Sequence, residues 1–323
     1  MRDYPVGAEA LRKQSLLNNR WPIQGTKVDN WDDVEVLWWN VFYTELKIDP
    51  KEHPLLITLP LSLTSKDRER MTMLVFENFN CPEFFASDSA PLALYASGRT
   101  TGHVVDSGHC RTAAIPVYEG FPLMNAVQTF DIGGRDITRH FRSLLADSQT
   151  AITNKTDELV IRDIKEYCCY LTDDPYPAIV NKRWEEQSYT LPDGNTIYFG
   201  TERFRAPEPM FSPIIGLPTT VMRAILRTDT KLRDEMSRDI LLVGGNTLFP
   251  GFADRLQQGL AAITPYLMKA PSVVTPPDAK LSAWLGGSIV ASLSTFRDMC
   301  IQAKEYEEYG PVMMRRKCWG LGL

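Results

Sequence analysis

The stretch Asp239-Ile240-Leu241-Leu242-Val243-Gly244-Gly245-Asn246-Thr247 is the clearest indication of the fold class of this chain. Its run of branched apolar residues is typical of a strand that is covered on both faces, and the glycine pair that follows indicates a tight turn. Apolar residues at helical spacing then run from Phe252 to Leu260. Because a buried strand that leads through a glycine turn into a helix is typical of α/β proteins, the sequence predicts this class.

Glycine turns at the ends of strands have a chemical use as well as a structural one. Backbone without side chains lets a ligand approach closely, and the N–H groups at the start of a helix attract anions. The turn Asp106-Ser107-Gly108 can likewise present amides to a phosphate while Asp106 holds a hydrated divalent cation. Taken singly, the Gly244-Gly245 turn is more often structural, and the other is equally well explained as a hairpin turn.

The first third of the chain predicts two helices and a strand. Asn30 is a good N-cap for a helix. The apolar residues expected on the inner face of that helix are Val34, Leu37, Trp38, Val41 and Phe42. Leu55–Leu59 is almost wholly apolar, which suits a strand covered on both faces, and Thr64 or Ser65 then caps the next helix.

The middle of the chain repeats the alternation of strands and helices. Residues 103–106 and 112–118 predict two strands joined by a tight turn. Helix signals follow the glycine pair at 133–136 and resume over 158–166. Residues 171–215 hold many turn formers, including Leu191-Pro192-Asp193-Gly194, which indicates a smaller inserted lobe.

The length and composition favour a folded protein of about two domains. The chain has 323 residues, of which 44% are hydrophobic and 23% charged, and this mixture excludes collagen, a coiled coil and a disordered tail. Its 35 basic and 40 acidic side chains give a net charge of −5, so no field of the whole protein attracts nucleic acid or anionic lipid. We therefore expect no direct contact with nucleic acid.

Targeting and redox signals favour a soluble cytoplasmic protein. The six cysteines are scattered and form no C-x-x-C pair, which indicates reduced thiols. The N-terminus lacks the apolar core of a signal peptide, and no apolar run approaches the ~20 residues that span a bilayer. We therefore expect no membrane partner.

Two further patterns have simple explanations. His103, His109, Cys110 and His140 do not have the spacing of a zinc site, so we expect ordinary surface or turn histidines. The mixed charge run Lys66–Arg70 is typical of a solvated helix face rather than of a nucleic-acid site.

Taken together, ordered motifs along the chain resemble the actin and actin-related protein family. The matching segments, in chain order, are Leu94–Gly102, Asp106–Gly108, Ile115–Gly120, Gly133–Asp136, Ile164–Glu166, Leu191–Gly194, Glu202–Arg205, Gly244–Thr247, Trp284–Phe296 and Arg316–Cys318. The resemblance extends from about Tyr4 to Trp319, and so many segments in the family's order do not agree by chance.

The resemblance implies an actin-like α/β fold of two lobes, each an RNase H-like half, with ATP or ADP and Mg²⁺ in the cleft between them. The first lobe is expected at residues 1–97 and 288–323, with a remnant of its small subdomain at 1–22. The second lobe is expected at 98–287, with an inserted small subdomain at about 133–215.

The resemblance also assigns residues to the nucleotide. Asp106 and Gly108 would remain from the second phosphate loop, and Asp106 would hold the magnesium ion. The other residues implied to line the nucleotide are Gly134, Arg162, Lys165 and Glu166 around the adenine and ribose, Gly244, Gly245, Asn246 and Thr247 along the phosphates and nucleoside, and Lys280 over the base.

Several departures from the family pattern affect activity. Actins begin with a strand and a glycine-rich hairpin that grips the β- and γ-phosphates, and this sequence starts after them, so the first lobe is expected to lack its N-terminal strands. Leu55–Leu59 would then have an exposed apolar edge, which a partner strand, a rearranged N-terminus or an incomplete sequence would each explain. His109 and Cys110 replace an aspartate and a glycine. Ser89 and Ala113 replace the glutamine and histidine near the attacking water.

These departures imply a divergent actin-related protein with weak or no ATP hydrolysis, because phosphoryl transfer depends on positioning and charge neutralisation. The leading hypothesis is a structural or interaction subunit of a cytoskeletal or chromatin assembly, in the cytoplasm or the nucleus. The alternative is a conventional polymerising actin or centractin-type ATPase represented by an incomplete sequence. A sugar kinase or Hsp70-like ATPase shares the two-lobed core, but the matching segments are those of actins.

The resemblance bears on partners as well. The segment that reaches the opposite strand in family filaments lies between Phe211 and Asp229, where this chain is shorter, so we do not expect a self-sufficient filament. Tyr95 and residues 296–318 remain actin-like. They imply a groove that accepts the amphipathic helix of an actin-family subunit or an actin-binding protein.

Overall fold

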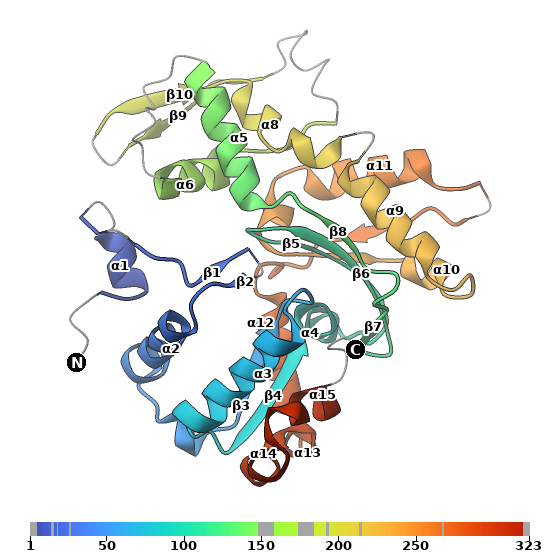
Figure 1. Cartoon of the computed structure of the whole chain (residues 1–323). Coiled ribbons are helices and arrows are strands. Elements are labelled where there is room, and N and C mark those ends of the chain that lie inside the picture. The colour runs from blue at the N-terminus through green and yellow to red at the C-terminus, as the bar shows by residue number, and fades with distance from the viewer. Residues whose placement is uncertain are drawn as a thin grey trace. The chain divides into compact units, whose positions relative to one another are not determined.

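The computed structural model describes residues 5–13, 16–17, 19–25, 27–147, 158–173, 184–191, 194–212, 215–266 and 268–318 (Figure 1). The chain divides into two compact units, Met1–Leu92 with Gly287–Leu323 (unit 1) and Ala93–Gly286 (unit 2). Parts of the predicted remnant at 1–22 and of the predicted insertion at 133–215 lie outside the described residues, as do Pro192 and Asp193 of the predicted turn.

Unit 1 contains short helices around a small sheet. Its elements are α1 (Ala8–Arg12), β1 (Ile23–Gln24), β2 (Lys27–Val28), α2 (Trp31–Trp39), a π-helix (Asn40–Leu46), a 3-10 turn (Pro50–Glu52), β3 (Leu55–Leu59), α3 (Ser65–Met73), a second π-helix (Leu74–Asn78), β4 (Glu83–Asp88), α13 (Phe296–Met299), β13 (Ile301–Gln302), α14 (Ala303–Tyr309), a 3-10 turn (Gly310–Val312) and α15 (Met313–Lys317). The division between the units falls inside α4 (Ser89–Ala96) and α12 (Ser282–Ala291).

The sheet of unit 1 has the strand order β13-β4-β3, with β3 parallel to β4 and β13 antiparallel to it. Phenylalanine rings fill the core beside it: Phe76 meets Phe84 edge-on at 6.2 Å between centroids, and Phe42 meets Phe79 at 5.2 Å. These aromatic pairs bury a large apolar area in a unit with only three strands in this sheet.

The predicted strand at Leu55–Leu59 forms, but the expectation that both of its faces are covered is wrong. Leu59 is buried, Thr58 is exposed, and the remaining three residues are half-buried. Among the residues that the structure describes, β3 pairs with β4 alone, so it is an edge strand of this sheet. The apolar sequence predicted the strand correctly, but the burial of its faces depends on what packs against the sheet, which the local sequence does not show. Its unpaired edge agrees with the exposed apolar edge expected from the sequence.

The caps predicted for the first two helices are confirmed. The Asn30 side chain accepts hydrogen bonds from the backbone N–H groups of Asp32 and Asp33, and the Thr64 side chain accepts one from Asp67. The expected apolar face of the first helix is wrong at one position, because Val41 is exposed. The helix widens into a π-helix at Asn40–Leu46, and the changed period turns this side chain outward.

The prediction of a solvated charge run at Lys66–Arg70 is wrong for its central residue. Arg68 is 4% exposed, and its Nε donates a hydrogen bond to the Leu63 carbonyl at 3.0 Å. Its Nη2 lies 3.4 Å from Oδ1 of buried Asp88, at the end of β4. The spacing of charged residues along the helix did not predict that Arg68 is buried. Its carboxylate partner Asp88 lies on another element, in the sheet.

Unit 2 is built on a larger mixed sheet. Its elements are β5 (Gly102–Ser107), β6 (Thr112–Tyr118), β7 (Phe121–Pro122), β8 (Gln128–Phe130), α5 (Gly134–Asp147), α6 (Glu158–Cys168), β9 (Gln187–Thr190), β10 (Thr196–Phe199), α8 (Glu202–Arg205), a 3-10 turn (Glu208–Phe211), α9 (Leu217–Arg227), α10 (Arg233–Met236), β11 (Ile240–Val243), a 3-10 turn (Gly245–Leu248), α11 (Phe252–Ile263) and β12 (Val273–Val274). The predicted strands at 103–106 and 112–118 are confirmed as antiparallel neighbours.

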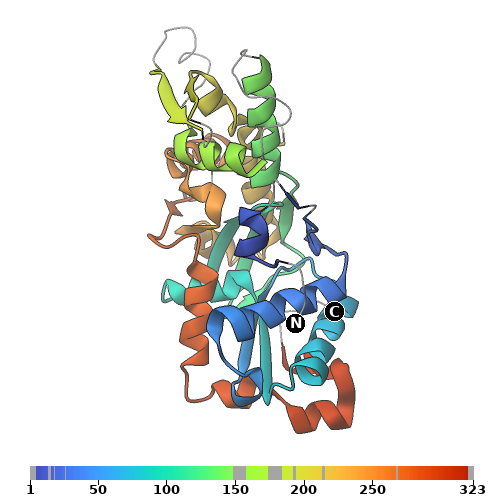
Figure 2. The same cartoon turned by 90° about the vertical axis from the view of Figure 1, so that its left-hand side faces the viewer.

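The sheet of unit 2 has the order β12-β11-β5-β6-β7, with β8 also paired to β6. The decisive stretch forms β11, which runs parallel to both β12 and β5 and is buried at all of its residues. Helix α9 packs against β6, β8 and α11, and α5 packs against α6 and α8. The two-stranded antiparallel sheet of β9 and β10 is separate and lies away from β5 and β6 in both views (Figures 1 and 2).

The expectation of ordinary surface or turn histidines is wrong for His103. This side chain lies on β5 and is fully buried, and neither ring nitrogen has a hydrogen-bond partner of good geometry among the described residues. Burial lowers the pKa of His103 to about 3, although the backbone of Met236 acts in the opposite direction. The imidazole is therefore neutral at physiological pH and serves as a core side chain.

Candidate functional site

Two turns lie side by side because β5 and β11 are parallel neighbours. The register places Val243 beside Asp106, so the chain leaves both strands at the same edge of the sheet. Gly244 has φ +90°, and a side chain there would strike the backbone carbonyl of Ser107 and approach Oδ1 of Asp106 to 3.0 Å. Only glycine permits this close approach of the two turns.

The side chain of Asn246 joins the two turns. Its Nδ2 donates hydrogen bonds to the Gly108 carbonyl at 2.8 Å and to Oγ of Ser107 at 3.2 Å. Ser107 in turn shares a 2.8 Å hydrogen bond with Thr112 on β6. Because this buried network satisfies the polar groups at the strand ends, the turn backbone is held in one conformation.

A second glycine pair places the start of α5 against the same turn. A side chain at Gly133 would lie 2.5 Å from the backbone of Cys110, so no larger residue fits. The Gly134 N–H donates to the Gly108 carbonyl at 3.0 Å. A side chain at Gly134 would lie 2.9 Å from Oδ1 of Asn246. The first turn of α5 is thereby fixed beside the ends of β5 and β11.

Helix α6 contributes a buried cation. Lys165 is 3% exposed, and its Nζ donates a hydrogen bond to the Gly134 carbonyl at 3.1 Å. Burial lowers the pKa of Lys165, while the charges of Glu166 and Cys169 raise it and that of Arg162 lowers it further. The free-energy cost of desolvating the ammonium therefore exceeds the favourable electrostatic interactions that its neighbours provide.

These elements enclose a cavity of about 410 Å³ within unit 2. The residues that line it are Gly108, His109, Gly134, Arg162, Lys165, Glu166, Gly245, Asn246, Leu248, Phe249 and Lys280. The structure thus brings together most of the residues assigned from the resemblance. Asp106, Gly244 and Thr247 are not among the lining residues. Gly244 packs against Ser107, and Thr247 is buried with its hydroxyl donating to the Gly244 carbonyl at 2.8 Å.

Three lining residues were not assigned from the sequence. His109 was considered in the sequence as a metal ligand and as a departure from the family pattern but was not assigned to the nucleotide, although it follows Gly108 directly. Leu248 and Phe249 continue the 3-10 turn that begins at Gly245. Their position after a glycine motif is the only sequence signal that points to them, and it does not predict which way their side chains face.

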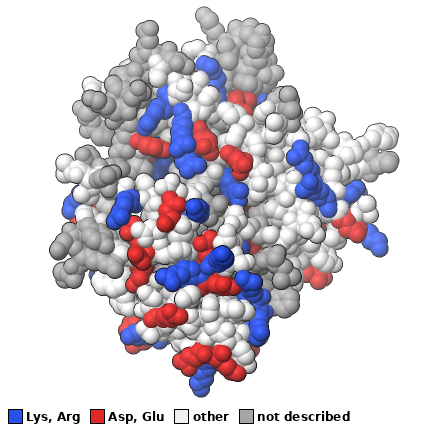
Figure 3. Space-filling model, in the orientation of Figure 1, with Lys and Arg blue, Asp and Glu red and all other residues white. Residues whose placement is uncertain are grey.

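The charges around the cavity are predominantly positive. Partial burial lowers the pKa of His109, and the charges of Lys165, Arg135 and Arg162 lower it further, whereas Glu158 alone raises it. On the face shown in Figure 3, basic and acidic side chains are interspersed over the described residues. The site therefore differs locally from a chain whose net charge is negative.

The cavity offers suitable groups for a nucleotide phosphate but few ligands for a metal ion. Gly245 has open space where a side chain would begin, and Lys165 offers N–H donors elsewhere in the same lining, so backbone and cation can both meet an anion such as phosphate. For Mg²⁺ the turn offers the carboxylate of Asp106, and the described residues contain no group of three or more His, Cys, Asp or Glu side chains arranged around a cation position.

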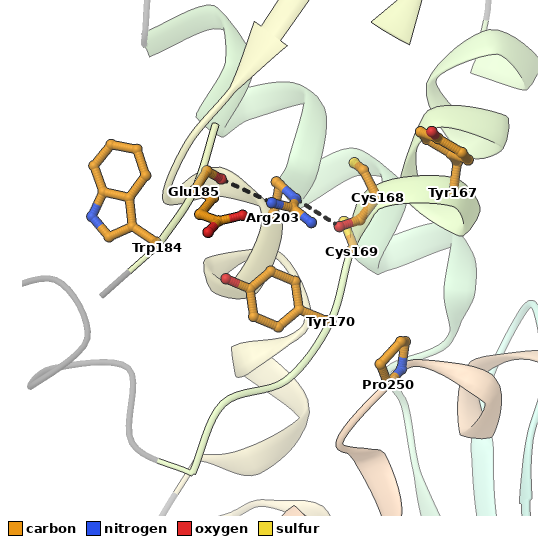
Figure 4. A pocket seen from close by; sticks show the side chains of 8 residues that line it. All are labelled: Tyr167, Cys168, Cys169, Tyr170, Trp184, Glu185, Arg203 and Pro250. Carbon is orange, nitrogen blue, oxygen red and sulfur yellow. Dashed lines mark hydrogen bonds between the residues drawn. The ribbon is translucent and has the colours of Figure 1, made fainter. Parts of the chain in front are cut away.

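A second cavity of about 660 Å³ lies elsewhere in unit 2. Its lining residues are Tyr167, Cys168, Cys169, Tyr170, Trp184, Glu185, Arg203 and Pro250 (Figure 4). Arg203 donates hydrogen bonds to the carbonyls of Cys168 and Glu185, both at 2.9 Å, and its guanidinium lies 4.9 Å from the Tyr170 ring centroid. The arginine ties the end of α6 to the segment before β9.

The protein is thus an α/β protein of two units. Unit 2 contains a positively charged cavity at the glycine turns that follow β5 and β11, next to the start of α5 and to α6. The family model described as Actin matches residues 1–319. The chain belongs to the actin family, and its fold is an actin-like α/β fold. None of the described helices has the length and apolar character needed to cross a membrane.

Proposed function

We propose that this protein is a nucleotide-binding structural subunit of an actin-family assembly, with weak or no ATP hydrolysis. Members of the actin family bind ATP or ADP with a divalent metal ion. The observation that carries the proposal is the cavity of unit 2, where buried Lys165 and the open backbone at Gly245 face the same space. A phosphate chain is the ligand that suits an ammonium and glycine amides together.

The residues near the expected attacking water support weak hydrolysis. Ala113 lies directly opposite Asp106 in the β5–β6 pair, and its methyl group neither donates nor accepts a hydrogen bond. Ser89 begins α4. Its short hydroxyl group has less reach than the glutamine that the resemblance expects there. Since water activation in phosphoryl transfer needs a positioned polar group, these side chains favour binding without fast turnover.

Phosphate release from ATP by the purified full chain tests the hydrolysis part of the proposal. We expect no release above the background of the Asp106→Ala variant. Release by the unaltered chain that disappears in Asp106→Ala would identify an active ATPase and overturn this part. It would favour the alternative, a conventional polymerising ATPase.

A single-methyl substitution tests nucleotide binding. In Gly245→Ala the new methyl group meets nothing within 4 Å, so the fold is expected to tolerate it. Because Gly245 lines the cavity, the added methyl group is expected to interfere with a phosphate that contacts the backbone there. We expect at least a tenfold weaker affinity for ADP by calorimetry, with an unfolding temperature close to that of the unaltered chain. Equal affinity of the two proteins would contradict the assigned position of the phosphates.

We propose partners among actin-family subunits and actin-binding proteins, and a cytoskeletal location. Support comes from family membership and from the actin-like sequence around Tyr95 and 296–318. The Tyr95 hydroxyl packs against Gly120, whose φ of +86° belongs to the turn between β6 and β7. Affinity purification followed by identification of bound chains tests this proposal, and recovery of no actin-family or actin-binding protein would count against it.

A further inference from the structure

Two adjacent cysteines line the cavity of about 660 Å³ in unit 2. Cys168 is the last residue of α6 and Cys169 follows it, and their side chains are only 2% and 3% exposed. In the view of Figure 4 both side chains lie between Arg203 and Tyr167. The proposed nucleotide site does not use them, because neither cysteine is among the residues that line the cavity of about 410 Å³.

The two sulfur atoms are close together. Both residues are free thiols, and their side chains are hydrogen-bonded to each other. Adjacent residues within a regular helix point in different directions, but α6 ends at Cys168, so the pair lies where the helix gives way to the following segment. The hydrogen bond places both sulfur atoms within reach of one small ion in the cavity.

The donor set favours a soft ion that needs few ligands. Thiolate sulfur selects soft metal ions such as Cu(I) and zinc over magnesium or calcium. Zinc almost always takes four ligands in a protein, and the described residues contain no group of three or more His, Cys, Asp or Glu side chains around a cation position. Cu(I) is satisfied by fewer ligands than zinc and prefers sulfur. The thiol pair therefore suits Cu(I).

Fixed positive charges beside the pair match the charge of such a complex. Two thiolates and one Cu(I) ion carry a single negative charge, and a buried anion needs a cation nearby. Lys165 and Arg203 are close enough to Cys169 for their charges to act on its thiol. Arg203 is held in place by its hydrogen bonds to the carbonyls of Cys168 and Glu185. The Glu185 side chain is exposed, so solvent screens its opposing charge.

Two other buried thiols, Cys300 and Cys318 in unit 1, are arranged differently. The Cys300 Sγ donates a hydrogen bond to the Phe296 carbonyl at 3.3 Å, and the Cys318 Sγ accepts one from the Ala86 N–H at 3.4 Å. Both sulfur atoms are thus bonded to backbone groups, and neither residue is in the lining of the cavities described above. Cys168 and Cys169 differ from them because they are bonded to each other and line a cavity.

We propose that Cys168 and Cys169 bind one Cu(I) ion as thiolates, with Lys165 and Arg203 balancing the charge of the complex. Each sulfur gives up its proton when it binds the ion, so two protons leave for each ion bound. No electron is transferred, because copper remains Cu(I) and both sulfur atoms remain reduced. The site is separate from the nucleotide cavity and does not depend on it.

Titration of the reduced full chain with Cu(I), without oxygen and against a chromogenic Cu(I) chelator, tests this inference. We expect the chain to take one equivalent of Cu(I) from the chelator and to release protons as it does so. An X-ray absorption spectrum at the copper edge should show sulfur as the only neighbour of the ion. Cu(I) that stays on the chelator, or nitrogen or oxygen neighbours in the spectrum, would overturn the inference and leave the proposed nucleotide binding intact.

Three alanine variants assign the ion to the pair. Cys168→Ala and Cys169→Ala each remove one sulfur without burying an unpaired hydroxyl group, as serine would. We expect each variant to bind Cu(I) about a hundredfold more weakly, because the second thiol acts as an intramolecular ligand for a bound ion. Cys110→Ala removes a half-buried thiol of the same unit outside the lining and should bind Cu(I) as the unaltered chain does. Loss of binding in Cys110→Ala, or full binding by either variant of the pair, would contradict the assignment.

Discussion

Asp88 and Arg68 are charged residues that the structure buries, although the sequence around Arg68 predicts a solvated helix face. The pair lies 3.4 Å apart in unit 1 with both side chains almost fully buried. Asp88 Oδ2 and Arg68 Nη1 have no hydrogen-bond partner among the described residues. Burial raises the pKa of Asp88 to about 7 despite the attraction of Arg68, and burial lowers the pKa of Arg68 despite Asp88. Desolvation therefore exceeds the attraction between the two charges.

This pair gives unit 1 a pH dependence of known sign. Because the pKa of Asp88 is higher in the folded than in the unfolded chain, the folded state holds the extra proton between about pH 4 and 7. The stabilisation is complete below that range and is lost as the pH rises through about 7. We expect the free energy of unfolding to fall with pH, by at most about 1.4 kcal/mol per pH unit.

Denaturant unfolding followed by tryptophan fluorescence at pH 5, 6, 7 and 8 checks this prediction, since Trp31 and Trp38 report on unit 1. Asp88→Asn should remove this contribution to the slope. Asp298→Asn changes an exposed carboxylate of the same unit and should retain the slope of the unaltered chain. Parallel pH profiles for the unaltered chain and Asp88→Asn would contradict the assignment.

At the scale of elements, helix starts and strands follow from local chemistry. A side-chain oxygen at Asn30 or Thr64 satisfies backbone N–H groups that no helix partner reaches, so the sequence marks the starts of α2 and α3 correctly. Both helices then change period where they pass into π-helices at Asn40 and Leu74. The sequence does not predict the change from an α-helix to a π-helix. In α2 this change altered which side chains are buried.

The cap of α3 gives a second prediction. Thr64→Ala removes the acceptor for the Asp67 N–H and should destabilise the helix by about 1 kcal/mol, whereas Thr64→Ser keeps the hydroxyl group. Hydrogen exchange of the first-turn amides of α3 measures the effect. Faster exchange in Thr64→Ala only is the expected result, and equal exchange in both variants would show that the hydroxyl group does not stabilise the start of the helix.

At the scale of the whole molecule, the cavity residues all belong to unit 2 and come from segments far apart in the sequence. A ligand that binds the folded cavity protects the elements that form it. A ligand at a hundredfold excess over its dissociation constant stabilises them by about 2.7 kcal/mol. We expect ADP to slow hydrogen exchange at the ends of β5 and β11 and at the start of α5. Unchanged exchange at these amides under saturating ADP would place the ligand elsewhere.

The α/β class and the strand and helix positions around Gly244 followed from the amino-acid sequence alone, because apolar runs, caps and glycine turns act over a few neighbouring residues. Membership of the actin family followed from the order of motifs along nearly the whole chain. The burial of Lys165 and His103 and the pairing of Arg68 with Asp88 became visible only in the folded chain. Burial and electrostatic pairing depend on elements that come together from distant parts of the chain. A local sequence pattern does not show which distant elements will be in contact.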